Sequence, residues 1–311
     1  MDIILSIAPV FILICLGYAL RRGGIPSAEF WNLNDRLVYF LLMPALFYVR
    51  ISTAELSGEV LATLATVLYA AFFAAIAYGV LVGWLIRRDG AVVTSLLQGV
   101  GRFNTFIALA VAEALYGAPA LQIAVLAAAA LVPVVNLTVV SLFALYLPRP
   151  GARPVVTALK GLATNPLILS ILAGLLANWA GLGGLPVLHD TLAVLGAAAL
   201  PIMLLCVGAN LKLRGLSGDA LPIALSALGK LVVFPAVVLA LAMALGVEPM
   251  QAQVLLIYGA LPTGVAAYTL ARQLGGDAPL MAAMITVQTL LSFAAMPIWI
   301  AVGEWLFLGA G

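Results

Sequence analysis

Two stretches, Gly101-Arg102-Phe103-Asn104-Thr105 and Gly259-Ala260-Leu261-Pro262-Thr263, decide the fold predicted for this sequence. They lie 158 positions apart (259 minus 101), each in the middle of a long apolar segment, and both are typical of a break in a membrane helix. A membrane helix can be interrupted only where the freed backbone groups face protein or a water-filled cavity. Paired breaks in two homologous halves therefore indicate a site that faces such a cavity.

The composition indicates an integral membrane protein. Of the 311 residues, 65% are hydrophobic and 8% are charged, and the mean hydropathy of +1.21 is too high for a water-soluble chain of this length. Apolar runs of spanning length predict an all-α fold with ten transmembrane helices. These helices are expected near residues 3–20, 33–50, 60–86, 91–116, 120–147, 164–180, 191–210, 221–246, 250–271 and 279–308.

Lys and Arg are distributed unevenly between the two sides of this predicted topology. The connections after odd-numbered helices hold ten of them, whereas the other side holds only Arg50. Because basic residues stay in the cytoplasm, both termini are expected on the non-cytoplasmic side of the cell inner membrane. The ten residues are Arg21, Arg22, Arg87, Arg88, Arg149, Arg153, Lys160, Lys212, Arg214 and Arg272.

An internal repeat extends beyond the two breaks. Residues 9–20 (PVFILICLGYAL) align with residues 166–177 (PLILSILAGLLA) at offset 157, and Pro44 aligns with Pro201 at the same offset. Chance similarity between Ala- and Leu-rich helices is the alternative, but nearly one offset through three helix pairs favours duplication. Because five helices per half is an odd number, the halves form inverted repeats. The expected divisions are a first repeat (1–147), a short cytoplasmic linker (148–163) and a second repeat (164–311).

The two breaks are expected at the same depth. The fourth helix enters near residue 91 and reaches Gly101 after ten residues, and the ninth enters near residue 250 and reaches Gly259 after nine. At about 1.5 Å per residue, both breaks lie near the middle of a core about 30 Å thick. Since the halves are inverted, broken helices 4 and 9 are expected to meet from opposite faces and cross at the midplane.

Each second half-helix is expected to begin at its break. Asn104 suits the N-cap position, and Pro262 suits the first turn, where its missing N–H costs nothing. Free N–H groups and positive dipole ends would then face a buried cavity, which favours an anion. Asn104, Thr105, Pro262 and Thr263 are therefore candidate substrate-binding residues, and the alternative is that they only cap or kink helices.

Two deep cations point to the same ligand chemistry. Arg102 and Lys230 are expected near mid-depth, where a cation costs about 2.5 to 3.5 kcal/mol. The Arg102 guanidinium can grip two carboxylate oxygens. Lys230 is expected to act in charge compensation or coupling, or alternatively to neutralise the negative ends of the first half-helices. Asn136 and Gln288 are further candidate ligands near mid-depth, with a helix-to-helix hydrogen bond as the alternative for each.

Several motifs resemble the auxin efflux carrier family, which includes bacterial malonate and malate permeases. The most specific stretch runs from residues 260–263 (ALPT) to 267–277 (AYTLARQLGGD), and the likeness covers essentially the whole chain. Two features depart from the family pattern. Asn104 stands where many members have a proline, and the connection between the halves is too short for the hydrophilic loop of the plant carriers. The other motifs are residues 102–110 (RFNTFIALA), 165–167 (NPL), and Lys230-Leu231 followed by Pro235.

The resemblance implies a ten-helix fold of two inverted five-helix repeats, with broken helices 4 and 9 crossing at the substrate site. It also implies that helices 1, 2, 6 and 7 form a scaffold, often dimeric. Helices 3 to 5 and 8 to 10 would move against this scaffold as an elevator-type transport domain.

The expected function is secondary transport of a small organic anion, a carboxylate, by alternating access around the crossing. The expected partners are that anion, the lipid bilayer and a second copy of the chain, with no cofactor, metal or nucleic acid. One alternative is a sodium- or proton-coupled carrier of related fold, which would need a buried Asp or Glu at the crossing. Another is an intramembrane enzyme, which would need paired catalytic groups. The chain has no GxxxxGK[ST] loop that would indicate ATP hydrolysis.

Overall fold

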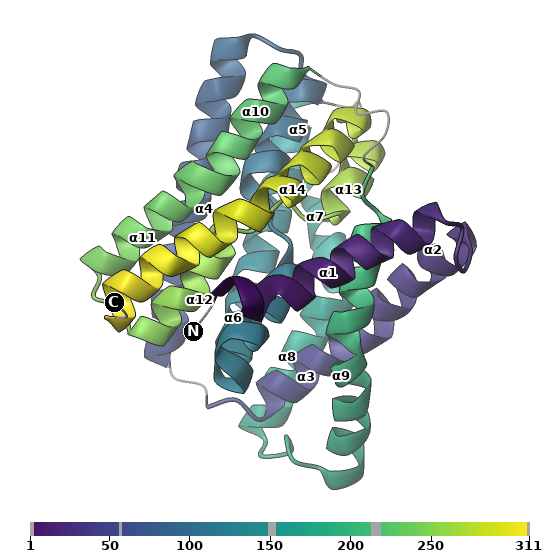
Figure 1. Ribbon diagram of the computed structural model, residues 1–311, viewed down its shortest axis with the longest axis vertical. Helices are drawn as coiled ribbons and strands as arrows, with labels where there is room; N and C mark the ends of the chain where they lie inside the picture. The colour runs from purple at the N-terminus through teal and green to yellow at the C-terminus, as the bar shows by residue number, and fades with distance from the viewer. Residues whose placement is uncertain (1–2, 56–57, 149–153, 213–218, 310–311) are drawn as a thin grey trace.

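The computed structural model describes residues 3–55, 58–148, 154–212 and 219–309 (Figure 1). These residues form helices joined by short connections and contain no β-strand, which confirms the all-α prediction. In chain order the helices are α1 (Ile3–Arg22), α2 (Ala28–Leu37), π-helical η1 (Val38–Leu42), α3 (Met43–Ser52), α4 (Gly58–Ile86), α5 (Gly90–Gly101), α6 (Thr105–Tyr146), α7 (Pro154–Ala163), α8 (Pro166–Trp179), α9 (Pro186–Ala209), α10 (Ala220–Leu228), π-helical η2 (Gly229–Val233), α11 (Phe234–Ala244), α12 (Pro249–Gly259), α13 (Ala266–Leu274), α14 (Ala278–Gly303) and π-helical η3 (Glu304–Leu308).

Six helical segments of the described chain are long and apolar enough to cross a membrane: Ile3–Arg22, Gly58–Ile86, Gly90–Tyr146, Pro186–Ala209, Ala220–Ala244 and Ala278–Leu308. This result supports a multi-pass membrane protein. Three of the predicted helices fall outside the six, each for a physical reason. The predicted helix 164–180 corresponds to α8, which has only 14 residues. The predicted helix 33–50 is divided among α2, η1 and α3, and α2 has a polar sequence. The predicted helix 250–271 is divided between α12 and α13.

The predicted helices 91–116 and 120–147 lie together in the segment Gly90–Tyr146, which has 57 residues. Two features divide this segment. It leaves helical geometry between α5 and α6, and it turns again at Gly117, whose φ of 71° is in the left-handed region that favours glycine. A straight helix of this length would be far longer than a bilayer is thick.

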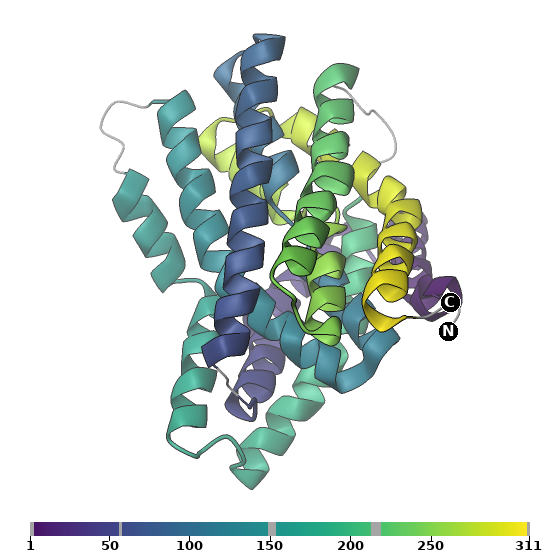
Figure 2. The same ribbon diagram turned by 90° about the vertical axis from the view of Figure 1, so that its left-hand side faces the viewer.

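Close backbone contacts hold one group of helices together. A Cβ placed on Gly17 of α1 would lie 2.0 Å from the carbonyl oxygen of Leu205 in α9, so these helices approach more closely than any larger residue allows. α8 and α3 also pack closely, although less tightly, because a Cβ on Gly174 would lie 3.0 Å from Ile51 Cβ and 3.3 Å from the carbonyl oxygen of Tyr48. Figures 1 and 2 show α1, α2, α3, α8 and α9 gathered on one side of the molecule, with α4, α5 and α10 to α14 on the other.

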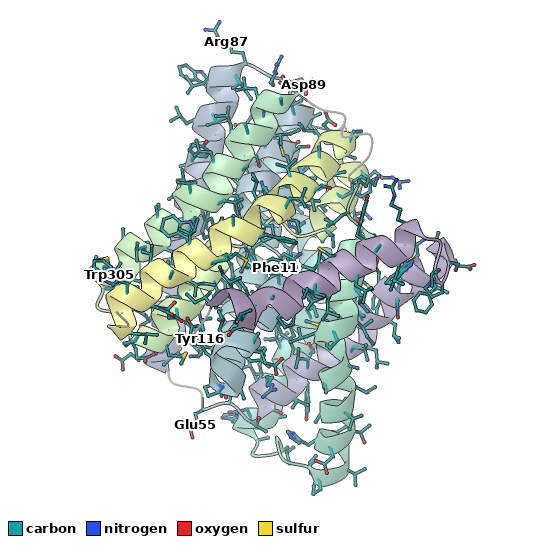
Figure 3. All side chains as sticks on the ribbon, in the orientation of Figure 1. Phe11, Glu55, Arg87, Asp89, Tyr116 and Trp305 are labelled. Atoms are coloured by element: carbon teal, nitrogen blue, oxygen red, sulfur yellow. The ribbon has the colours of Figure 1, made fainter. Side chains whose placement is uncertain are left out.

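The connections before and after α4 lie toward opposite ends of the molecule. In Figure 3, Arg87 and Asp89, which join α4 to α5, lie at one end and Glu55, shortly before α4, lies toward the other. The two ends of the described chain lie near each other in both views (Figures 1 and 2). Arg149, Arg153 and Arg214, which contribute to the predicted cytoplasmic charge, lie outside the described residues.

The connection between the predicted halves contains more structure than expected. Residues 148–163 were expected to form a plain linker, but α7 occupies the last ten of them, Pro154–Ala163. Proline suits the first position of a helix, and Val, Leu and Ala recur at helical spacing through PVVTALKGLA. A second helix N-terminus follows at once, where Asn165 caps α8.

Candidate functional site

The first break separates α5 from α6. α5 ends at Gly101, the backbone extends through Arg102 (ψ 154°), and α6 begins at Thr105. Asn104 is the N-cap of α6, because its Oδ1 accepts hydrogen bonds from the backbone N–H groups of Phe106 (3.2 Å) and Ile107 (3.3 Å). Capping uses only the oxygen of this amide. Its Nδ2 is buried and has no hydrogen-bond partner among the described residues.

The second break is longer, from the end of α12 at Gly259 to the start of α13 at Ala266. The prediction that Pro262 occupies the first turn of the second half-helix is therefore wrong. The backbone around it is held by contacts with other elements. The carbonyl oxygen of Pro262 accepts a bond from the first break, and Thr263 donates its backbone N–H to the Gln288 side chain (2.9 Å) and not back into a helix.

The two breaks touch each other. The backbone N–H of Asn104 donates to the carbonyl oxygen of Pro262 at 2.9 Å. A Cβ on Gly264 would lie 2.7 Å from the carbonyl oxygen of Phe103, so this close approach requires glycine. Two segments far apart in sequence thus pack backbone to backbone and share a hydrogen bond in the protein interior.

Gln288 of α14 holds the second break against the end of α5. Its Oε1 accepts from the backbone N–H (2.9 Å) and Oγ1 (2.7 Å) of Thr263, while its Nε2 donates to the Gly99 carbonyl (3.0 Å) and Ser226 Oγ (2.9 Å). Gln288 and Thr263 are fully buried. With all these groups engaged, Gln288 acts as a helix-to-helix brace, the alternative that its sequence position left open.

Arg102 is held by neutral oxygens. Its Nη2 donates a hydrogen bond to Asn136 Oδ1, and its Nη1 lies 3.5 Å from Gln98 Oε1. Neither ion pair in the described part of the chain involves Arg102. The guanidinium charge is thus positioned by amide groups without a carboxylate that would neutralise it, and its fork keeps further N–H donors for a ligand.

A cavity of about 130 Å³ lies against the first break. Four of the predicted site residues line it, and they are Arg102, Asn104, Thr105 and Asn136. From the second break the lining comes from Gly264, Val265 and Ala266, whereas Pro262 and Thr263 are buried and do not line the cavity. The cavity therefore combines one cation, three side-chain amides and two hydroxyls with apolar walls.

Two polar side chains in the lining were not among the predicted site residues. Tyr39 comes from η1, and Asn165 is the residue that caps α8. Because η1 lies between α2 and α3 and Asn165 precedes α8, both residues are distant in sequence from the breaks, and only tertiary packing brings them to the cavity. Asn165 could have been predicted from the sequence, because an Asn before a Pro suits the N-cap position of a helix, which is also the position of Asn104.

Lys230 lies beside the first break and outside the cavity lining. It is fully buried in η2, and its Nζ is 4.2 Å from the ring centre of Phe234 and 6.0 Å from that of Phe103. Nζ has no hydrogen-bond partner among the described residues. The helices that pack on η2 (α4, α5, α10, α11 and α14) contain one charged residue, Glu59 at the start of α4. Among the described residues, the Lys230 amino group therefore has aromatic rings, and no polar group, as the neighbours that favour its charged form.

Comparison with known proteins identifies the family. The family model described as Membrane transport protein matches residues 2–300. A Rhizobium meliloti (strain 1021) protein named "Putative malonate transporter" is 28% identical, and the alignment covers 93% of this chain and 92% of that protein. An "Uncharacterized transporter" of Methanothermobacter thermautotrophicus (strain Delta H) is 24% identical, and the alignment covers 94% of this chain and 96% of that protein. The chain therefore belongs to the membrane transport protein family, the auxin efflux carrier family that its sequence resembles, and is a membrane transporter and not an enzyme.

Proposed function

We propose that this protein is a secondary carrier for a small carboxylate, which it moves by alternating access around the contact between the two breaks. One observation carries the proposal: Arg102 and Asn104 line one cavity with donors that the protein itself does not satisfy. Arg102 has no carboxylate partner among the described residues, and Asn104 has a buried Nδ2 without an acceptor. A carboxylate supplies the negative charge and the oxygens that these groups lack.

The size of the cavity favours a small acid. Its volume of about 130 Å³ is below the roughly 300 to 1,000 Å³ of sites that bind drug-sized ligands. A short mono- or dicarboxylate suits such a space better than a bulky aromatic acid. The relative from Rhizobium meliloti carries malonate in its printed name, which agrees in chemical class with this proposal.

Packing supports the proposed inverted repeat. Gly17 lies against Leu205, and Gly174 lies against Tyr48. At the repeat offset of 157, Gly17 corresponds to Gly174 and Tyr48 corresponds to Leu205, so these are the same contact in the two halves. Inverted repeats related by a two-fold axis predict this exchange, and they also predict that equivalent residues meet on the axis. Asn104 and Pro262, at offset 158, do meet.

The proposed ten-span topology adds four crossings to the six candidate spans. The segment Gly90–Tyr146 would cross twice, and the helices 28–52 and 166–179 and the pair α12 and α13 would cross once each.

The tightly packed group α1, α2, α3, α8 and α9 would be the scaffold, and the remaining helices would be the moving part. We further propose a homodimer in the inner membrane with both termini on the non-cytoplasmic side, since basic residues concentrate on the other side.

A sodium- or proton-coupled carrier remains the rival function. It would need a carboxylate at the breaks to bind the cation. The sequences 98–106 and 259–266 contain no Asp or Glu, and Arg102 stands there instead. The anion carrier is therefore the better proposal.

Thermal stabilisation of the purified protein tests the proposal. Malonate, malate, lactate and indole-3-acetate should be compared with sodium, lithium and a pH series, because a ligand that binds the native state raises apparent stability. We expect stabilisation by one or two of the small acids and none by indole-3-acetate. Stabilisation by sodium or by pH alone would overturn the anion proposal in favour of the cation-coupled rival.

A further inference from the structure

Three cations surround a second cavity, remote in sequence from the breaks. The cavity has a volume of about 270 Å³ and lies where α1 and α9 end. Arg21 and Arg22 close α1, and Lys212 follows the end of α9. We call this the basic pocket. Its remaining lining residues are Tyr18, Ala209, Asn210 and Leu211.

Glycines create the basic pocket by allowing α1 and α9 to pack backbone to backbone. A Cβ on Gly208 would lie 1.8 Å from the carbonyl oxygen of Ile14, and one on Gly17 would lie 2.0 Å from that of Leu205. In α1 these contacts come about one to two turns before the helix end, and in α9 they lie in about the last turn. The close crossing therefore brings like charges from two helix ends together, which is unfavourable unless something compensates them.

The protein supplies little compensation. Both ion pairs in the described chain, Arg50 with Glu113 and Arg88 with Asp219, lie elsewhere. Arg21 Nη1 is buried and has no hydrogen-bond partner among the described residues. Asp35 is near enough to interact electrostatically with Arg21, but its Oδ2 accepts instead from Asn210 Nδ2 at 2.9 Å.

The other two cations, Arg22 and Lys212, are each held in place by a tyrosine side chain. Arg22 Nη1 donates to Tyr18 Oη at 2.8 Å, which uses one of five guanidinium N–H groups. Lys212 Nζ lies 4.3 Å from the ring centre of Tyr268 in α13, and its backbone N–H donates to Thr286 Oγ1 at 3.2 Å. The positions are thus defined while donors remain available to a ligand.

We infer that the basic pocket binds a phosphate-bearing anion. Guanidinium forks match phosphate geometry, and several cations on one small cavity suit a group that carries more than one anionic oxygen. Exposed apolar residues of α1, Ile12 and Leu16, lead along the helix toward the pocket. An anionic lipid could therefore place its phosphate in the pocket and its acyl chains along α1, which is the arrangement of head-group sites between membrane helices. A soluble phosphate would use the same donors.

Native mass spectrometry and thermal shift of the full chain test this inference. The protein is purified in neutral detergent and exposed to four probes: phosphatidylcholine vesicles, vesicles of equal parts phosphatidylcholine and phosphatidylglycerol, inorganic phosphate, and glycerol phosphate. The test variant is Arg21→Gln with Lys212→Gln. The matched control is Arg36→Gln with Lys160→Gln, which also removes one arginine and one lysine, from exposed positions outside the pocket.

We expect phosphatidylglycerol to be retained and to stabilise the wild type and the control. A juxtamembrane cation contributes roughly a factor of five to affinity for anionic lipid, so the test variant should bind about twenty-five times more weakly. Stabilisation by inorganic phosphate or glycerol phosphate that is lost in the test variant would also support the pocket, and it would indicate that the ligand is a soluble phosphate and not a lipid.

Two results would overturn the inference. One is a lack of response to phosphatidylglycerol, inorganic phosphate and glycerol phosphate alike, and the other is an equal loss in the test and control variants, which would show non-specific charge. The single change Arg22→Gln, at an exposed side chain, provides the measurement if the double variant does not fold. It should weaken the same binding about fivefold, and unchanged binding would contradict the site.

Discussion

Replacing Arg102 with glutamine removes the charge that we place opposite the substrate carboxylate. Glutamine retains an amide that can reach Asn136 or Gln98, so the change deletes a cation without opening a large space. The matched control is Arg36→Gln, an exposed arginine of α2 outside the cavity.

The structure gives the size of the expected effect. Of the five N–H donors of Arg102, one donates to Asn136 and another lies within reach of Gln98, which leaves donors for a carboxylate. Hydrogen bonds to a charged group contribute about 1.5 to 3 kcal/mol, so we expect carboxylate affinity to fall by about tenfold to 150-fold. The unliganded protein should not lose stability, because a cation at membrane depth itself costs about 2.5 to 3.5 kcal/mol.

Two measurements on each variant separate binding from folding. Melting temperature is recorded against carboxylate concentration to obtain Kd, and uptake of the same acid is measured in liposomes. An affinity within twofold of wild type would refute the role of Arg102. A lower melting temperature of the unliganded variant with unchanged Kd would make Arg102 a structural contact of Asn136.

Four further substitutions have defined outcomes. Asn104→Ala should weaken carboxylate binding about tenfold and lower stability by about 1 kcal/mol through loss of the N-cap; a stability loss alone would leave Asn104 as a cap only. Gln288→Leu leaves buried donors and acceptors unpaired, so stability should fall by about 2 to 4 kcal/mol, and a melting temperature equal to wild type would contradict the brace. Gly264→Ala should reduce liposome uptake strongly, because its Cβ would lie 2.7 Å from the Phe103 carbonyl oxygen; normal uptake would show that the breaks can separate. Lys230→Met should keep binding within about fivefold and leave the melting temperature unchanged or higher, because the ammonium has no polar partner; a binding loss as large as that of Arg102→Gln would make Lys230 a ligand.

Much of the helical pattern was predictable from local sequence. Long apolar runs and the Asn104 cap follow from hydropathy and capping rules, which act over a few residues. The lengths of the breaks were less predictable. Pro262 was expected inside a helix, but the backbone there is fixed by Asn104 and Gln288, which come from other parts of the chain.

The candidate site was likewise only partly predictable from the sequence. Arg102 was predicted because a charge at membrane depth is costly without a purpose, and Asn104 because it suits the N-cap position at one of the paired breaks. Chemistry alone could not separate Asn136, which lines the cavity, from Gln288, which is buried as a brace. Two amides at similar depth differ only in which helix face they occupy and what packs against that face.

The sequence by itself determined that this is a helical membrane protein, because apolar content acts locally and a chain in lipid has few alternatives to a helix. The tertiary structure decided that the segments around Asn104 and Pro262 touch. It also decided which buried polar groups form hydrogen bonds with each other and which have no partner among the described residues. Those outcomes depend on close helix crossings, such as the one at Gly17, where contact between residues distant in sequence is set by packing and not by any local preference.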